Sequence, residues 1–163
     1  YRESYDLFAC SGILFNHESP LRGHEFVTKK ITKSLAKIKM GLQANMSLGN
    51  IEAKRDWGFA GDFVEAMHKI VQQKEPGDYV VCTAVQHSIR ELLTTAFRTA
   101  EIDDWEQYVE SDPRYKRPAE VFALHGSYAK AKEKLGWEPK TEFKDMIAFM
   151  VKEDIRRLSH DLR

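Results

Sequence analysis

The hydrophobic positions of this 163-residue chain fall into short apolar runs that alternate with longer stretches of helical spacing. Short runs of this kind predict strands, here over residues 7–15, 46–48 and 78–83. Apolar residues that recur every three or four positions predict amphipathic helices, here over residues 26–42, 63–71 and 88–100. The order strand, helix, strand, helix, strand, helix predicts an α/β fold.

The first apolar run, residues 7–15, is nearly continuous and is broken only by small residues. This pattern predicts a strand buried on both faces, as in a parallel sheet. Such a strand needs neighbouring strands and covering helices, and three or four short strands are too few to provide them. The chain also begins at Tyr1 rather than at a methionine. We therefore expect an incomplete α/β unit with further sequence upstream.

The second half of the chain predicts more helix than strand. Ser88 and Glu91 have the spacing of a capping box, so we expect a helix to begin there. Residues 104–109 are a possible strand, and residues 128–135 predict a short helix that ends near Gly136. A C-terminal helix is expected over residues 143–158, with its basic residues in the last turns.

Composition narrows the functional classes. Lys plus Arg and Asp plus Glu both number 25, so the net charge is zero and neither a nucleic-acid partner nor a membrane surface is expected. No apolar stretch approaches the roughly 20 residues that span a bilayer. Cys10 and Cys82 each lie in an apolar run and are interpreted as buried free thiols, which fits a reducing, cytoplasmic location.

The first candidate for binding chemistry is the polar segment 16–23, which follows the first predicted strand. Asn16, His17 and Arg22 can donate hydrogen bonds to phosphate or ribose, and Gly23 permits close backbone approach. In open α/β sheets, ligands bind at the carboxyl ends of strands. Since any polar loop contains some of these residues, a functional and a plain loop both stay open.

Three further segments carry cations that suit an anion. Lys29 and Lys30 lie in the first turn of a helix, where a bound anion would offset their unfavourable interaction with the dipole; a solvated lysine face is the alternative. Arg55 suits bidentate contact with phosphate, or a structural pair with its neighbour Asp56.

The third segment is the loop 112–120. In it Arg117 precedes a stiffening proline, and Glu120 could accept hydrogen bonds from ribose hydroxyls. A solvated loop is the competing interpretation. Motifs for other chemistries are absent from the chain: there is no G-x-G-x-x-G, no P-loop, no nucleophile elbow and no zinc-ligand spacing. We therefore expect no metal site.

In this order, the cationic segments resemble those of the GDP-mannose 4,6-dehydratase family of extended short-chain dehydrogenase/reductases. The resemblance covers nearly the whole chain, and the run Asn16-His17-Glu18-Ser19-Pro20 is especially typical of the family. The other matching stretches are residues 12–15, 26–31, 48–50, 54–58, 112–115, 117–121 and 134–139. Each motif is weak alone, and the ordered set is specific.

The resemblance implies a C-terminal part of a Rossmann-like enzyme. Residues 1–23 would end the cofactor-binding domain, and residues 24–163 would form mainly the small mixed α/β domain that binds the nucleotide sugar. The implied reaction converts GDP-mannose to GDP-4-dehydro-6-deoxy-mannose and water. In it NADP takes hydride from C4 of the sugar and returns hydride to C6, so that the cofactor is regenerated within each cycle.

The resemblance also implies roles for individual residues. His17 and Arg22 would contact NADP, and the GDP portion would be contacted by Asn16, Lys30, Arg55, Arg117 and Glu120. The Thr–Glu pair and the Tyr-x-x-x-Lys motif that do the family's chemistry would precede Tyr1, so we expect no catalytic residue in this chain and no activity from it alone.

The chain departs from the family at Leu21, where an arginine is usual. In relatives this loop reaches a neighbouring subunit, so a homo-oligomer is expected and Leu21 bears on one of its contacts. The alternatives are a related NADP-dependent nucleotide-sugar reductase or epimerase, and a non-catalytic binding module from a truncated gene.

Overall fold

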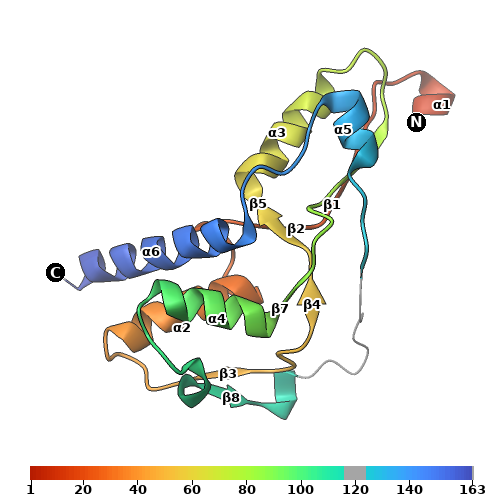
Figure 1. Cartoon of the computed structure of the whole chain (residues 1–163). Helices are drawn as coiled ribbons and strands as arrows, with labels where there is room; N and C mark the ends of the chain where they lie inside the picture. Colours follow the sequence, from red (N-terminus) through yellow and green to blue (C-terminus); the bar gives the residue numbers. More distant parts are fainter. Residues whose placement is uncertain (116–123, 163) are drawn as a thin grey trace.

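The computed structural model describes residues 1–115 and 124–162 of the chain. Figure 1 shows its helices and strands in two groups that are joined by extended connections. In chain order the elements are α1 (Arg2–Tyr5), β1 (Ser11–Leu14), β2 (Asn16–Glu18), α2 (Val27–Lys39), β3 (Met46–Leu48), β4 (Lys54–Arg55), β5 (Trp57–Phe59), α3 (Ala60–Val71), β6 (Asp78–Val81), β7 (His87–Ser88), α4 (Ile89–Thr99), η1 (Trp105–Tyr108), β8 (Val109–Ser111), η2 (Pro113–Tyr115), α5 (Ala129–Leu135) and α6 (Phe143–Asp161).

The described strands pair two by two, and three of the four pairs are parallel. β1 pairs with β6, β2 with β5 and β3 with β8 in parallel, whereas β4 pairs with β7 in antiparallel orientation. Parallel strands require a crossover connection, and helices provide these crossovers here. The predicted α/β class is confirmed.

The prediction of one strand buried on both faces over residues 7–15 is wrong. β1 covers only Ser11–Leu14, and its residues are exposed or half-buried. The side chain of Ile13 is 55% exposed, and Leu7 and Phe8 are exposed as well. The physical reason is that, among the described residues, β6 is the only strand that pairs with β1, so β1 lies at the edge of a two-stranded sheet.

Two other predicted segments also differ from the structure. Residues 16–18, predicted as loop, form β2 because their backbone pairs with Trp57–Phe59 of β5. Residues 104–109, predicted as a possible strand, begin with Asp104 at a φ of 52° and continue as the 3₁₀ turn η1. The extended backbone starts only at Val109, where β8 pairs with β3.

The core consists of two hydrophobic clusters, one in each group of elements (Figure 1). The larger cluster lies between α2, α4 and α6 and contains Leu35, Phe97 and Met150. The smaller one lies between α3, α5 and β6 and contains Phe63 and Trp137. β1 and β2 pair with β6 and β5, which come much later in the chain. The division of the chain at residue 23 stays a prediction.

Local signals at the helix ends are confirmed. The Ser88 hydroxyl accepts a hydrogen bond from the backbone N–H of Glu91, and the Glu91 carboxylate accepts one from the backbone N–H of Ser88. This reciprocal pair satisfies N–H groups that have no partner inside the helix. At the end of α5, Gly136 adopts a φ of 58°, which glycine reaches without a steric penalty.

The interface between α2 and α6 contains a buried ion pair that the sequence did not predict. The Lys29 ammonium donates hydrogen bonds to Asp154 and to the carbonyl oxygen of Pro20, and Thr32 donates to the other Asp154 oxygen at 2.7 Å. Lys29 is 4% exposed. Its charge is therefore neutralised inside the protein, and the interpretation of Lys29 as a contact for a bound anion or as a solvated lysine is wrong.

Replacement of Asp154 by alanine should destabilise the protein strongly, because the Lys29 ammonium would stay buried without a counter-charge. Removal of one partner from a buried pair costs about 3–5 kcal/mol. Urea denaturation measures the loss. Lys132→Ala is the matched control, since it removes an exposed pair with Glu138 and should have little effect. Equal stability losses in the two variants would contradict the prediction.

Both cysteines are free, as predicted, but they differ in exposure. Cys82 is fully buried, and Cys10 is half-buried. Burial is the main cause that raises the pKa of the Cys82 thiol to about 11. Because the thiolate is the reactive form, iodoacetamide at pH 8 should modify Cys10 well before Cys82 in the native protein. Mass spectrometry checks the order, and equal rates of modification would contradict it.

Candidate functional site

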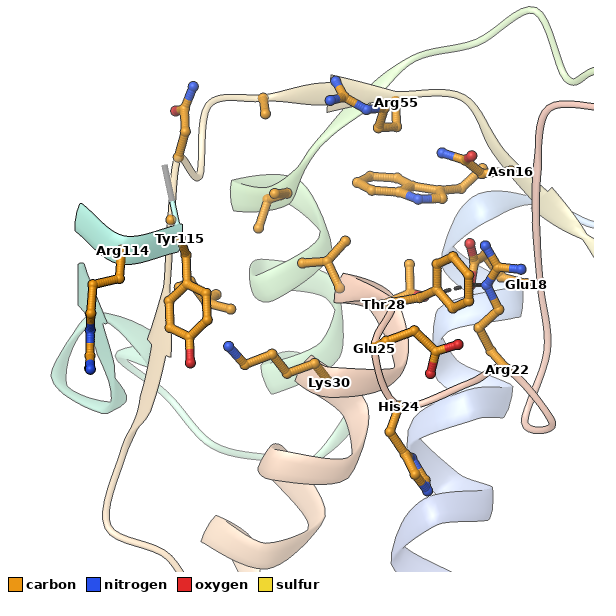
Figure 2. A pocket seen from close by; sticks show the side chains of 18 residues that line it. Asn16, Glu18, Arg22, His24, Glu25, Thr28, Lys30, Arg55, Arg114 and Tyr115 are labelled. Carbon is orange, nitrogen blue, oxygen red and sulfur yellow. Dashed lines mark hydrogen bonds and ion pairs between the residues drawn. The ribbon is translucent and has the colours of Figure 1, made fainter. Parts of the chain in front are cut away.

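A cavity of about 780 Å³ opens between the segment that follows β2, the start of α2 and the connection from β3 to β4. Figure 2 shows its polar side chains at two ends. Lys30 points toward Tyr115 at one end, and Asn16, Glu18 and Arg22 gather at the other. Apolar residues, among them Trp57, line the space between them. The volume is in the usual range for sites that bind small molecules and cofactors.

The structure brings together four of the seven residues that were predicted to bind substrate or cofactor. Asn16, Arg22, Lys30 and Arg55 all line this cavity. His17 belongs to the same strand as Asn16 but does not line it, because alternate residues of a strand point to opposite faces. Arg117 and Glu120 lie outside the described residues.

Lys30 is held at its end of the cavity by two contacts. Its ammonium donates a hydrogen bond to the carbonyl oxygen of Ser47 at 2.8 Å and lies 3.7 Å from the centroid of the Tyr115 ring. Tyr115 in turn lies against Gly49, where a Cβ atom would come within 2.5 Å of the Tyr115 carbonyl oxygen. The lysine is therefore fixed beside an aromatic ring, with its positive charge at this end of the cavity.

Arg22 occupies the opposite end. Its guanidinium lies 3.4 Å above the Phe26 ring, and its Nε atom lies 3.2 Å from Oε2 of Glu18. The Glu18 carboxylate is 1% exposed and accepts a hydrogen bond from the Thr28 hydroxyl. Sequence reasoning missed Glu18, Thr28 and Tyr115 as residues of the site, because each contact depends on the fold.

His17 lies on the other side of β2, where its ring stacks on Phe63 at a centroid distance of 5.2 Å. Its Nδ1 atom is 2.9 Å from the carbonyl oxygen of Phe15. A carbonyl oxygen only accepts hydrogen bonds, so this contact requires the proton on Nδ1. In the neutral ring Nε2 is then an acceptor, which suits a hydroxyl group of a ligand better than a phosphate.

Arg55 and Asp56 have separate environments. Arg55 lines the cavity and donates from Nη1 to the Lys54 carbonyl oxygen at 2.6 Å. The Asp56 carboxylate accepts hydrogen bonds from the backbone N–H groups of Thr83 and Ala84 and from the Thr83 hydroxyl. Asp56 therefore orders the segment that follows β6, and Trp57 beside it is a buried core residue.

The described residues contain neither a cluster of metal ligands nor a membrane-spanning helix. Within residues 1–115 and 124–162, no group of three or more His, Cys, Asp and Glu side chains is arranged to hold a metal ion. No helix in the same part of the chain is long and apolar enough to cross a bilayer. The cavity offers positive charge, amide and hydroxyl groups and an aromatic ring, together with the carboxylates of Glu18 and Glu25. Its cationic donors are of the kind that pair with phosphate oxygens.

The fold and this cavity define the class of the protein. The chain superimposes on RMD from Pseudomonas aeruginosa complexed with NADPH with a TM-score of 0.86 and 25% identity, covering 96% of this chain and 51% of that one. It also superimposes on a dTDP-glucose 4,6-dehydratase from Bacillus anthracis with a TM-score of 0.82 and 15% identity, covering 100% and 50%. These are Rossmann-like extended short-chain dehydrogenase/reductases, and the chain has part of their fold.

Sequence comparison gives the family. Residues 1–150 match the family model of GDP-mannose 4,6 dehydratase, and the chain belongs to this family. It is 56% identical over 155 residues to GDP-mannose 4,6 dehydratase 2 of Arabidopsis thaliana, covering 95% of this chain and 41% of the relative. The human GDP-mannose 4,6 dehydratase is 44% identical, with coverages of 95% and 46%. The chain thus spans less than half the length of these relatives.

Glu18 should make stability depend on pH. Burial raises the pKa of its carboxyl group, and the hydrogen bond from Thr28 and the charge of Arg22 oppose this shift only in part. The folded state therefore binds the proton more tightly than the unfolded state does. The stability that protonated Glu18 contributes is complete below pH 4.5, the ordinary pKa, and is lost as the pH rises through the raised folded pKa.

The Glu18→Gln variant cannot lose this proton. Relative to the variant, the wild type should lose free energy of unfolding as the pH rises from 4.5 through the raised pKa, and the difference should then stay constant. Urea denaturation of both proteins between about pH 4 and 8 measures this difference. If the wild type instead gained stability relative to the variant, the ion pair with Arg22 would outweigh burial.

Proposed function

We propose that this chain is the nucleotide-sugar-binding part of a GDP-mannose 4,6-dehydratase, a lyase that converts GDP-mannose to GDP-4-dehydro-6-deoxy-mannose and water. The observation that carries the proposal is the single cavity that Asn16, Lys30 and Arg55 share. These residues come from three separate segments of the chain, and each was expected at the GDP portion of the ligand. Family membership supports the same substrate.

The geometry suggests how the cavity would hold GDP. Lys30, fixed beside the Tyr115 ring, would contact one part of the nucleotide, and Arg55 would contact the diphosphate. Asn16 can both donate and accept, so it suits hydroxyl or phosphate oxygens. Arg117 and Glu120 keep their proposed roles at the phosphate and the ribose, respectively.

The proposed cofactor is NADP, which would supply the hydride acceptor of the reaction. The residues proposed to hold it fit this task in different ways. His17 presents Nε2 as an acceptor for a hydroxyl group, because its Nδ1 atom contacts the Phe15 carbonyl oxygen. Arg22 provides positive charge next to the cavity. The NADPH complex of the Pseudomonas aeruginosa RMD supports a nicotinamide cofactor in this fold.

We propose that the catalytic residues lie outside these 163 residues and that the isolated chain is inactive. The chain does contain one Tyr-x-x-x-Lys spacing, Tyr128 and Lys132 at the start of α5. The Tyr128 ring packs edge-on against Trp137, and the Lys132 ammonium donates to Glu138 at 2.5 Å. Neither residue lines the cavity, so this pair does not replace a catalytic one.

The full protein is proposed to be a cytoplasmic homo-oligomer. The free thiols of Cys10 and Cys82 fit a reducing compartment. Leu21 is 82% exposed beside Arg22, so it is accessible to a second subunit. A related NADP-dependent reductase or epimerase is the alternative, because the UDP-glucose 4-epimerase of Thermotoga maritima has the same fold, with a TM-score of 0.79. The family match favours the dehydratase.

The experiment is turnover of GDP-mannose by the full-length protein, together with GDP affinity by calorimetry. Arg55→Ala should weaken GDP binding roughly tenfold or more, because a hydrogen bond to a charged group contributes about 1.5–3 kcal/mol. Arg156→Ala is the control, since this exposed arginine pairs with Glu153 on α6 and should leave affinity unchanged. A wild type that binds GDP but forms no 4-dehydro sugar would favour the alternative enzymes. Absence of GDP binding would refute the proposal.

A further inference from the structure

Arg22 is placed in the cavity wall by its neighbours rather than by hydrogen bonds. Its guanidinium stacks on Phe26, and its Nε atom is 3.2 Å from Oε2 of Glu18. The geometry of that contact is an ion pair and not a hydrogen bond, because the buried Nε–H has no acceptor in line among the described residues. Among the described residues, the outer nitrogen atoms Nη1 and Nη2 also form no hydrogen bond or ion pair, so these donors can meet a ligand.

Glu18 is fixed more firmly than the arginine it faces. It is 1% exposed, it lies in β2, and the Thr28 hydroxyl in the first turn of α2 donates to the same Oε2 atom that faces Arg22. A buried carboxylate is costly unless a positive charge and hydrogen bonds compensate for it. Here the compensating charge is Arg22, so the positions of the two groups are coupled.

We infer that Glu18 is a positioning residue for Arg22. It holds the Arg22 guanidinium at the end of the cavity, so that the outer N–H groups of the arginine meet a phosphate group of the proposed cofactor NADP. The inference deepens the proposed function and rests on it, since it takes the phosphate from a bound nucleotide. Glu18 itself does not contact the ligand and acts through Arg22.

The direction in which Glu18→Gln changes anion affinity distinguishes positioning from a simple effect of charge. A carboxylate repels a nearby anion, so Glu18→Gln would tighten anion binding if only the field of Glu18 mattered. Positioning predicts the reverse. Without the ion pair the Arg22 side chain regains rotamer freedom that binding must remove, and this weakens affinity about fivefold.

The experiment is a double-mutant cycle on the full-length protein, with NADP⁺ and inorganic pyrophosphate as probes in calorimetry. Glu18→Gln should weaken both probes about fivefold. Arg22→Ala should weaken them more, and the double variant should bind like Arg22→Ala alone, because Glu18 acts only through Arg22. Glu25→Gln is the matched control for charge, since Glu25 lines the same cavity and forms no ion pair with Arg22 among the described residues. Loss of its negative charge should tighten the binding of both probes slightly, opposite in sign to the effect of Glu18→Gln.

A second variant, Thr28→Val, tests the inference even if Glu18→Gln fails to fold. Thr28→Val leaves the carboxylate in place and removes its hydrogen bond, so it should weaken both probes in the same direction but less. Tighter binding in Glu18→Gln, additive losses in the double variant, or unchanged affinity in both single variants would overturn the inference. So would a wild type without affinity for pyrophosphate.

Failure of the proposed function gives a different result. If the wild type bound neither GDP nor NADP⁺, while pyrophosphate showed the expected non-additive cycle, the nucleotide assignment would fail and the role of Glu18 would stand. If both nucleotides bound and the cycle were additive, the function would stand and the inference would fail.

Discussion

The Lys29 ammonium lies inside the protein, and its contacts hold three parts of the chain in place. It bonds to Asp154 of α6 and to the carbonyl oxygen of Pro20, while Thr32 of α2 bonds to the same carboxylate. Ammonium and carboxylate groups are costly to bury apart, so they fix the relative position of α2 and α6. The Pro20 carbonyl anchors the segment that carries Arg22 to the same interface. This polar cluster thus connects the main helical core to the wall of the cavity.

The cavity uses this anchored segment as one of its ends. Glu18 and Thr28 join β2 to the first turn of α2, and Arg22 lies over them with its charge beside the cavity. At the other end of the cavity, Lys30, two positions after Thr28 in the same helix, extends toward Tyr115 (Figure 2). Neighbouring residues in the first turn of α2 therefore serve both the core and the cavity. A shift of this helix would move Arg22 and Lys30 together.

The fold of this chain is shared by proteins of low sequence identity, whereas the side chains that line its cavity can differ among them. Structures with 15% and 22% identity share the fold, so the fold alone does not select a substrate. In the proposed function, the polar residues around the cavity select the ligand. Glu18 is an example. An apolar side chain of similar size would stabilise the fold about as well as this buried carboxylate does. The proposed role in positioning Arg22 would explain why a carboxylate is found at this place.

The sequence by itself determined the α/β class, the main helices, the capping box at Ser88 and the family, because these depend on local periodicity and on ordered motifs. It also gave Asn16, Arg22, Lys30 and Arg55 as candidates, because their residue types suit phosphate, and the fold brings these four to one cavity. Only the tertiary structure decided that Lys29 is neutralised in the core while Lys30 faces the cavity, since adjacent helical residues differ by one step around the axis and the partner Asp154 lies 125 positions away. It likewise decided the contacts of Glu18, Thr28 and Tyr115 and the exposure of β1, because burial depends on which distant segments pack against a residue.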